Sequence, residues 1–315
     1  MTDNTTANKM LSKRRRYWYS IFRNWQLYVF LLPAVAFTVV FQYMPMYGIQ
    51  LAFKDLSLRG GITASPWTTP LFRHFFEFFN SRKFFDVIKN TLFLNLYGLA
   101  VGFPFPIILA ILLNEVKSIR YRKLIQNMTY IPYFISTVVM VGMINLFFAQ
   151  NGIINQLVAY LNVEPTNFLS QGSLFPHIFV WTGLWKDMGY SSIIYFAALS
   201  GVPPELHEAA IIDGASRLRR IWHINLPHIR PTIIILLIFD CAYMLSFGFE
   251  RIYLMQNVIN INYSEVISTY IYKLGIQQRN FGLAAAVGLF QNVINIIIML
   301  LVNFIAGKTS ETSLF

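Results

Sequence analysis

Six long apolar stretches dominate this 315-residue sequence and restrict the folds open to it. A helix that crosses the hydrocarbon core of a bilayer needs about 20 mostly apolar residues. The stretches that meet this requirement are residues 27–45, 89–113, 127–149, 175–199, 231–249 and 282–305. Proline and glycine interrupt several of them, as at Pro104 and Pro106, and membrane helices tolerate such breaks. The sequence therefore predicts an all-α integral membrane protein with six transmembrane helices.

Composition agrees with a membrane protein and excludes several function classes. Only 12% of the residues are charged, whereas soluble domains carry about 25%. The net charge of +11 does not indicate nucleic-acid binding, because the basic residues cluster beside the apolar stretches without an RNA-binding motif. The single cysteine, Cys241, excludes an internal disulfide. Neither a metal-ligand spacing of His nor a catalytic constellation is visible, so no metal site and no enzymatic activity are expected.

A Gly-Lys-Thr sequence at 307–309 resembles the end of a phosphate-binding loop. Such a loop needs a preceding strand and a following helix, and neither fits here. Lys308 is more simply interpreted as a basic residue that anchors the end of the last span. The sequence therefore predicts no nucleotide site in this chain.

Basic residues predict the orientation of the spans, because Lys and Arg are enriched in short cytoplasmic loops. They gather in the N-terminal arm, in the second and fourth loops, and in the tail. The residues concerned are Lys13, Arg14, Arg15, Arg16, Arg23, Lys117, Arg120, Arg122, Lys123, Arg217, Arg219, Arg220, Arg230 and Lys308. The loop 150–174 has no Lys or Arg, which suits the outside. Both termini are thus predicted to be cytoplasmic. The first apolar run is too long for a signal peptide and lacks a cleavage pattern, so it is interpreted as a retained span.

The outer segment 71–90 reads LFRHFFEFFNSRKFFDVIKN. Its phenylalanines recur at helical spacing beside charged residues, which predicts an amphipathic helix. Such a helix either lies along the membrane surface or packs on the helical bundle, and packing is the simpler expectation.

The most polar long stretch in the second half is EAAIIDGASRLRRIWHINLPHIRP, residues 208–231, between spans four and five. Pro203 and Pro204 can start a helix, because proline suits the first helical position. Gly214 supplies the positive φ that ends it, and Ser216 suits the N-cap of a second helix. Pro227 is expected to end that second helix, and Pro231 to start span five. The pattern predicts a rigid pair of short helices, which is either an ordinary folded loop or a docking surface for a partner.

The same residues resemble a known signature. Glu208-Ala209-Ala210, Asp213-Gly214-Ala215, Ile224, Leu226-Pro227 and Pro231 are similar to the EAA motif of permease subunits of binding-protein-dependent ABC importers of type I. WKDMGYSSIIYFAALSGVPPEL (185–206) and Asn90-Thr91 also resemble that family. The polysaccharide and lipo-oligosaccharide branch of the carbohydrate permeases is indicated by Met44–Gly48, LSFGFERIYLMQN (245–257), SEVISTYIYKLG (264–275) and AAAVGLFQNVIN (284–295).

The resemblance implies a subunit that imports oligosaccharides or polysaccharide fragments and is coupled to an ATPase through the loop 203–227. The coupling residues it implies are Glu208, Ala209, Ala210, Asp213, Gly214, Leu226 and Pro227. Small alanines suit a tight groove, and Glu208 is placed to meet an Arg of the partner in a charge-assisted contact.

The partners implied are a second homologous permease, as a heterodimer, two cytoplasmic ATPase subunits, an extracytoplasmic solute-binding protein and membrane lipid. ATP and Mg²⁺ would bind to the ATPase subunits, with no cofactor on this chain. The location implied is the bacterial cytoplasmic membrane. The chain would then comprise a cytoplasmic basic arm (1–26), a first span with the extracytoplasmic amphipathic segment (27–88), a core permease domain (89–306) that includes the coupling loop 200–230, and a cytoplasmic tail (307–315).

Polar residues inside spans are candidates for a substrate pathway, because they are costly in a bilayer. The candidates are Asn145, Trp181, Trp185, Lys186, Asp187, Tyr190, Asp240 and Tyr243. Each of them could instead bridge helices, and Lys186 could pair with Asp240 as a structural strut. Basic residues of the outer segments, such as Arg251 and Lys273, would favour an acidic polysaccharide fragment.

Two other readings remain open from the residues. An ion-coupled secondary transporter of a small polar solute would need a repeat-related pair of broken helices. An intramembrane enzyme would need a nucleophile and base, or a metal constellation, in the spans. The sequence shows no clear example of either pattern.

Overall fold

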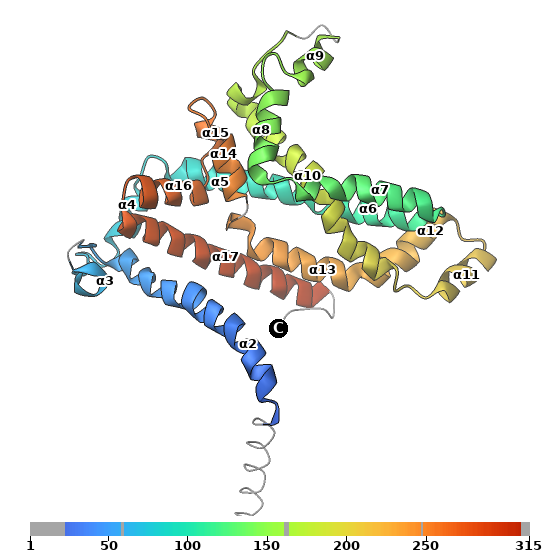
Figure 1. Cartoon of the computed structure of the whole chain (residues 1–315), viewed down its shortest axis with the longest axis horizontal. Helices are drawn as coiled ribbons and strands as arrows, with labels where there is room; N and C mark the ends of the chain where they lie inside the picture. Colours follow the sequence, from blue (N-terminus) through green and yellow to red (C-terminus); the bar gives the residue numbers. More distant parts are fainter. Residues whose placement is uncertain (1–22, 58–59, 161–163, 247, 310–315) are drawn as a thin grey trace, which may run out of the picture.

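The computed structural model of the chain describes residues 23–57, 60–160, 164–246 and 248–309. Within these ranges the regular structure is helical, apart from one isolated antiparallel bridge between Lys54 and Trp67. Long helices pack together in the body of the molecule, and short helices gather around their ends (Figure 1). The all-α prediction is therefore confirmed for the described residues.

The first predicted span is a continuous helical segment, Trp25–Phe53. It consists of α2 (Trp25–Thr38), the π segment η1 (Val39–Tyr43) and the 3-10 helix η2 (Met44–Phe53). Figure 1 shows α2 splayed away from the body, and only its continuation η2 packs closely on the last helix. The apolar part of this segment has no buried residue within the chain, so lipid or another protein must cover it in a membrane.

The outer segment that follows contains α3 (Gly61–Ala64) and α4 (Arg73–Phe79). The prediction of one amphipathic helix across 71–90 is wrong, because the helix ends at Phe79 and a new one starts at Phe84. Asn80 and Ser81 lie in the break, and these residue types favour turns over helix interiors. The break lets Phe78, Phe79 and Phe84 pack around Phe290 of the last helix, with ring centroids 5.6–6.5 Å from its ring. The expected packing on the bundle is thus confirmed for α4.

The second predicted span is longer than expected, Phe84–Glu115, and is made of α5 (Phe84–Gly102) and α6 (Pro104–Glu115). The third is not a single straight helix. The segment Ile119–Phe134, made of α7 (Ile119–Tyr130) and η3 (Ile131–Phe134), meets α8 (Thr137–Phe147) at 98°. Pro132 removes a backbone donor at the bend, and the Ser136 side chain caps α8 by accepting from the Val139 amide.

The fourth predicted span, 175–199, coincides with α10 (Phe175–Leu199). It follows a short α9 (Ile153–Ala159) that projects from one end of the molecule in Figure 1. Gly189 of α10 fits closely against α7, since a β-carbon there would lie 1.9 Å from the Thr129 carbonyl oxygen. This contact fixes α10 beside the bend of the third span.

The fifth span differs from the prediction at both ends. Residues Arg217–Ala242 form one helical segment of α12 (Arg217–Arg220), the π turn η6 (Ile221–Asn225) and α13 (Leu226–Ala242). Pro227 therefore does not end a helix and Pro231 does not start one. Pro227 instead occupies the first turn of α13, directly after the π turn, where a missing amide donor costs little.

The chain leaves α13 at Ala242, earlier than the predicted 249, and turns through η7 (Met244–Ser246). Gln291 donates to the Leu245 carbonyl oxygen at 2.6 Å, and Asn295 accepts from the Leu245 amide at 3.2 Å. Both residues belong to α17 (Phe281–Thr309), so hydrogen bonds from the last helix hold this turn in place. Between the turn and α17 lie α14 (Phe249–Met255), α15 (Ile261–Ser264), α16 (Ile267–Tyr272) and the π turn η8 (Lys273–Gln277).

Among the described residues, four helices are long and apolar enough to cross a membrane: Trp25–Phe53, Phe84–Glu115, Arg217–Ala242 and Phe281–Lys308. The bent pair α7–η3 and α8 makes a fifth if it forms one span. α10 is 25 residues long, about 37 Å at 1.5 Å per residue, but its polar residues make it less apolar than the other four. The number of six spans therefore remains a prediction. Four of the six predicted spans contain a helix that is long and apolar enough to cross a membrane.

Candidate functional site

The polar loop between α10 and α13 forms an arm that projects from the body of the molecule (Figure 1). Its first helix is α11 (Pro204–Ile212), and its second is α12. Gly214 joins them with φ = 76°, the left-handed conformation that glycine adopts without strain. The Ala215 amide donates to the Ala210 carbonyl oxygen at 2.8 Å, and the Ser216 hydroxyl accepts from the Arg219 amide at 3.3 Å. The short first helix, the glycine turn and the serine cap were all predicted, whereas the second helix is not short, because it continues into α13.

The two ends of the motif occupy different environments. Glu208, Ala209, Asp213 and Gly214 are exposed, and Ala210 is half-buried. Large apolar side chains accompany them on the arm, with Leu206, Ile211, Ile212, Leu218 and Trp222 all at least half exposed. Leu226 instead packs at the base of the arm on a core cluster around Leu199 and Ile229. An apolar surface rimmed by charges is typical of a protein-binding site.

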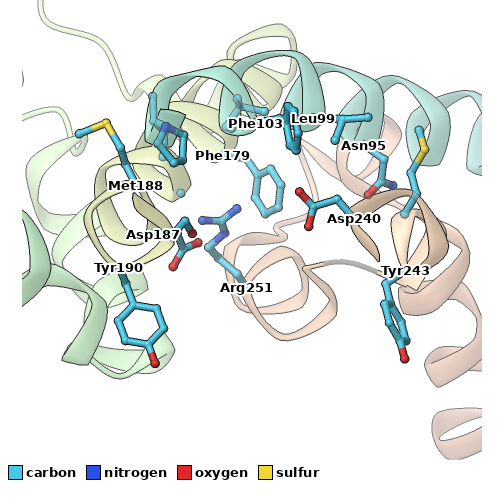
Figure 2. A pocket seen from close by; sticks show the side chains of 18 of the residues that line it. Asn95, Leu99, Phe103, Phe179, Asp187, Met188, Tyr190, Asp240, Tyr243 and Arg251 are labelled. Carbon is cyan, nitrogen blue, oxygen red and sulfur yellow. The ribbon is translucent and has the colours of Figure 1, made fainter. Parts of the chain in front are cut away.

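A cavity of about 530 Å³ lies in the body of the molecule, between α5, α6, α10, α13 and α14. Four of the predicted pathway residues line it: Asp187, Tyr190, Asp240 and Tyr243. Asp187 and Tyr190 come from α10, Asp240 lies in the last turn of α13, and Tyr243 follows that helix directly. Figure 2 shows the two carboxylates directed toward the centre of the cavity and the two tyrosines at its margin.

The other four predicted pathway residues do not line this cavity. Asn145 is exposed on α8. Trp181 and Trp185 are each 48% exposed on another face of α10, where Nε1 of Trp181 donates to the Tyr97 hydroxyl at 2.9 Å. Lys186 is half-buried, and no ion pair joins it to Asp240 in the described part of the chain, so the structural strut is not observed.

Arg251 is a charged residue of the cavity whose position was not predicted from the sequence. It was expected on an outer surface, but it is only 8% exposed and lines the cavity from α14. Its Cζ atom lies 3.9 Å from the centre of the Phe179 ring, a cation–π contact. Burial lowers the pKa of Arg251 to about 10, and the nearby Asp187 opposes this shift. The guanidinium therefore stays charged at neutral pH.

Two glycines allow Arg251 to reach this place. Gly248 has φ = 78° and is the N-cap residue of α14. Gly183 lies opposite on α10, where a β-carbon would be 2.1 Å from Nη1 of Arg251. These two glycines were the signal available in the sequence for the position of Arg251. They lie in distant segments of the chain, and only folding brings them together.

An aromatic stack closes one margin of the cavity. Tyr133 comes from η3, at the bend of the third span, and its ring is parallel to that of Tyr190. Both tyrosines line the cavity. The bend that the sequence did not predict therefore supplies a wall of the candidate site.

A charged cluster lies away from the cavity, where the loop before α16 meets the start of α5. Glu265 is buried and accepts from Lys83 at 2.5 Å and from Lys273 at 2.8 Å. Burial alone would raise the pKa of Glu265, but the hydrogen bonds from Lys273 and Lys83 hold it below its ordinary value. Lys273, proposed above as an outer basic residue, is thus engaged in an ion pair. Asn90 joins the same region by donating to the Glu265 carbonyl oxygen at 3.1 Å.

Comparison with known proteins shows close relatives along nearly the whole chain. Protein LplB of Bacillus subtilis (strain 168) is 42% identical over 290 residues, which cover 92% of this chain and 91% of LplB. A second relative from the same organism is the polygalacturonan/rhamnogalacturonan transport system permease protein YteP, which is 38% identical. The match covers 96% of this chain and 94% of YteP.

Solved structures of similar proteins also match nearly the whole chain. A chain in the crystal structure of a bacterial ABC transporter involved in the import of the acidic polysaccharide alginate is 39% identical, with a TM-score of 0.86. The match covers 93% of this chain and 99% of that chain. A second structure, in complex with an alginate pentasaccharide-bound periplasmic protein, has the same TM-score at 38% identity. The fold is therefore that of an ABC importer permease.

The family description that matches residues 102–311 is "binding-protein-dependent transport system inner membrane component". This range includes the bent third span, α10, the whole arm and α17. Because the match extends over most of the chain and the relatives cover nearly all of it, this multi-pass membrane protein belongs to the binding-protein-dependent transport system inner membrane component family.

Proposed function

We propose that this chain is one permease subunit of an ATP-driven importer of oligosaccharides or polysaccharide fragments in the bacterial cytoplasmic membrane. Its partners are a second, homologous permease, two cytoplasmic ATPase subunits and an extracytoplasmic solute-binding protein. ATP and Mg²⁺ bind to the ATPase subunits, and this chain hydrolyses nothing. Membership of the family sets aside both the ion-coupled secondary transporter and the intramembrane enzyme.

The observation that carries the proposal is the projecting arm with its motif residues at the turn. Glu208, Ala209 and Gly214 are exposed on α11 and the turn that follows it, with Leu206 and Ile212 beside them. A small-residue surface with flanking apolar and charged side chains suits a groove on a partner. Because α12 continues through η6 into α13, a push on the arm is transmitted directly into a membrane helix.

The same arrangement supports the proposed orientation of the spans. The arm must face the cytoplasm to meet an ATPase, and its arginines obey the positive-inside tendency. With six spans, Arg23 and Lys308 lie on that same side. The other basic residues of the N-terminal arm fall outside the described residues. The relatives support the substrate class, since YteP is described as a permease for polygalacturonan and rhamnogalacturonan, and one solved relative takes part in alginate import.

The cavity is the proposed section of the substrate pathway. Tyr190 and Tyr243 offer flat rings, and Asp187 and Asp240 offer hydrogen-bond acceptors, all within one lining. Sugars present apolar C–H faces and many hydroxyl groups, so this combination suits them.

Co-purification tests the proposal. A tagged chain is expressed with its native gene neighbours, extracted in mild detergent and assayed for nucleotide hydrolysis. A stoichiometric ATPase subunit, and ATP-dependent oligosaccharide uptake after reconstitution, are expected. A chain that purifies alone and takes up solute only while an ion gradient is maintained would overturn the proposal.

A further inference from the structure

The charged groups of the cavity make no hydrogen bond to the residues that the structure describes. In the part of the chain that the structure describes, neither a hydrogen bond nor an ion pair within 4 Å engages the side chains of Arg251, Asp187 or Asp240. Arg251 is nevertheless more than nine-tenths buried. None of its nitrogen atoms is among the fully buried, unpartnered polar atoms of the described residues, so its donors open onto the cavity, where a ligand can satisfy them.

The guanidinium is also fixed in position. Phe179 supports one face of it, and Gly183 leaves room for its Nη atoms. Figure 2 shows the carboxylates of Asp187 and Asp240 on opposite sides of the Arg251 guanidinium. The three groups therefore form a row of acceptor, donor and acceptor across the cavity, with the tyrosines at its margin.

We propose that Arg251 binds the carboxylate of a uronic-acid residue while Asp187 and Asp240 accept hydrogen bonds from hydroxyl groups of the same or the next sugar. This inference rests on the proposed function and narrows its substrate to acidic oligosaccharides. The planar fork of a guanidinium matches a carboxylate with two parallel hydrogen bonds. A neutral sugar would use the two aspartates equally well but would leave the guanidinium without a matching acceptor.

The charge of the cavity makes the role of Arg251 specific. Its lining contains two carboxylates and one guanidinium, so an incoming carboxylate is repelled everywhere except in direct contact with Arg251. Removing the guanidinium should therefore abolish the preference for acidic sugars rather than weaken the binding of all sugars equally. Removing the negative charge of Asp187 should have the opposite effect on an acidic ligand.

The test uses the complete transporter, purified with its partner subunits and placed in lipid nanodiscs without the solute-binding protein. The probes are trigalacturonate and its neutral methyl ester, and their dissociation constants are measured by titration calorimetry. For Arg251→Gln, we expect the dissociation constant for trigalacturonate to rise by about 10-fold or more, since hydrogen bonds to charged groups are of that strength. The constant for the ester should change by less than about 2-fold on the same scale.

Two further variants complete the design. Asp187→Asn keeps one acceptor oxygen for a sugar hydroxyl but removes a negative charge, so the dissociation constant of trigalacturonate should fall relative to that of the ester. This variant keeps the proposal testable if Arg251→Gln does not assemble. Arg279→Gln removes an exposed arginine outside the cavity and is the matched control, with no change expected for either probe.

The outcomes separate the two levels of inference. Equal losses for both probes in Arg251→Gln, or no loss for either, would overturn the role of Arg251 and leave an oligosaccharide permease. A wild-type transporter that binds neither probe, and takes up no oligosaccharide, would overturn the proposed function as well.

Discussion

The rings of Tyr133 and Tyr190 stack face to face, with centroids 3.8 Å apart and planes within 5° of parallel. Tyr133 lies at the bend of the third span, and Tyr190 follows the close contact between Gly189 and α7. The stack therefore holds a broken helix against α10 at the edge of the cavity. Tyr133 and Tyr190 are far apart in the sequence, so their contact depends on tertiary structure rather than on local geometry.

Removal of this stack should reduce both stability and transport. Aromatic pairs contribute about 0.5–1.5 kcal/mol beyond the area they bury, so a double-mutant cycle of Tyr133→Ala and Tyr190→Ala should give a coupling energy of that size. Thermal unfolding of the purified transporter measures it. Tyr190→Phe retains the ring and is the control, with near wild-type stability expected. Strictly additive effects of the two alanine substitutions would show that the stack contributes nothing.

Substitution of Gly214 should uncouple transport from ATP hydrolysis. A β-carbon at Gly214 meets no atom within 4 Å, so the cost of Gly214→Val arises from the positive φ alone, about 1–2 kcal/mol or more for a β-branched residue. The turn between α11 and α12 should change shape while the protein stays in the membrane. Glu208→Lys should give the same phenotype through the loss of its charge-assisted contact.

The measurement for the arm variants is uptake together with ATPase activity in proteoliposomes, with membrane abundance determined by immunoblot. Gly142→Ala is a matched control, because Gly142 is exposed on α8, has open space around its α-carbon and lacks a positive φ. Normal coupled uptake by Gly214→Val and Glu208→Lys would contradict the coupling role of the arm.

The structure separates two pathway candidates that the sequence treated alike. Asp240 lines the cavity, whereas Trp185 lies on another face of α10. Asp240→Asn should therefore change the rate or the substrate preference of uptake. Trp185→Ala should leave the substrate preference unchanged, although it exposes different surface to lipid or to the second permease. Competition assays with sugars of different charge measure both, and a shift in preference with Trp185→Ala alone would place the pathway elsewhere.

Local signals explain which features were predictable from the sequence. The bounds of α10 follow from an apolar run with Pro176 in its first turn, and the arm follows from Gly214 and Ser216, whose preferences are intrinsic to those residues. The resemblance to a known family added the role of the arm, which no local preference contains.

Features that depend on distant contacts were not predictable. Pro132 lies just before the bend of the third span, whereas Pro231 lies within a helix, and no rule for a single proline distinguishes the two. Arg251 follows the predicted fifth span by two residues, which indicates an outer loop. Arg251 is buried because the chain turns back after α13. Hydrogen bonds hold that turn in place, from Leu245 to Gln291 and Asn295, which lie more than 40 positions after Leu245.

Two glycines of α10 should respond differently to the same substitution. In Gly183→Ala the new methyl group meets the Nη atoms of Arg251, which end a side chain and can be displaced without moving the backbone. The fold should persist and the preference for acidic sugars should fall as in Arg251→Gln. In Gly189→Ala the methyl group meets the Thr129 carbonyl group, which belongs to the backbone of α7. That overpacking should cost about 1–3 kcal/mol and lower the melting temperature, as measured by fluorescence in detergent. A larger loss of stability in Gly183→Ala than in Gly189→Ala would contradict both assignments.

The cluster around Glu265 should make stability depend on acidic pH. The folded pKa of Glu265 lies below its ordinary value of 4.5, so its ionised form contributes stability that is present above pH 4.5 and is lost as the pH falls through the lower, folded value. Melting temperatures recorded from pH 7 down to pH 3 should therefore fall more steeply for the wild type than for Glu265→Gln, which should be less stable already at pH 7. Glu250→Gln removes an exposed glutamate of α14 and should retain the wild-type profile. If Glu265→Gln and the wild type lost stability in parallel down to pH 3, then the ion pairs with Lys83 and Lys273 would not be the source of the acid sensitivity.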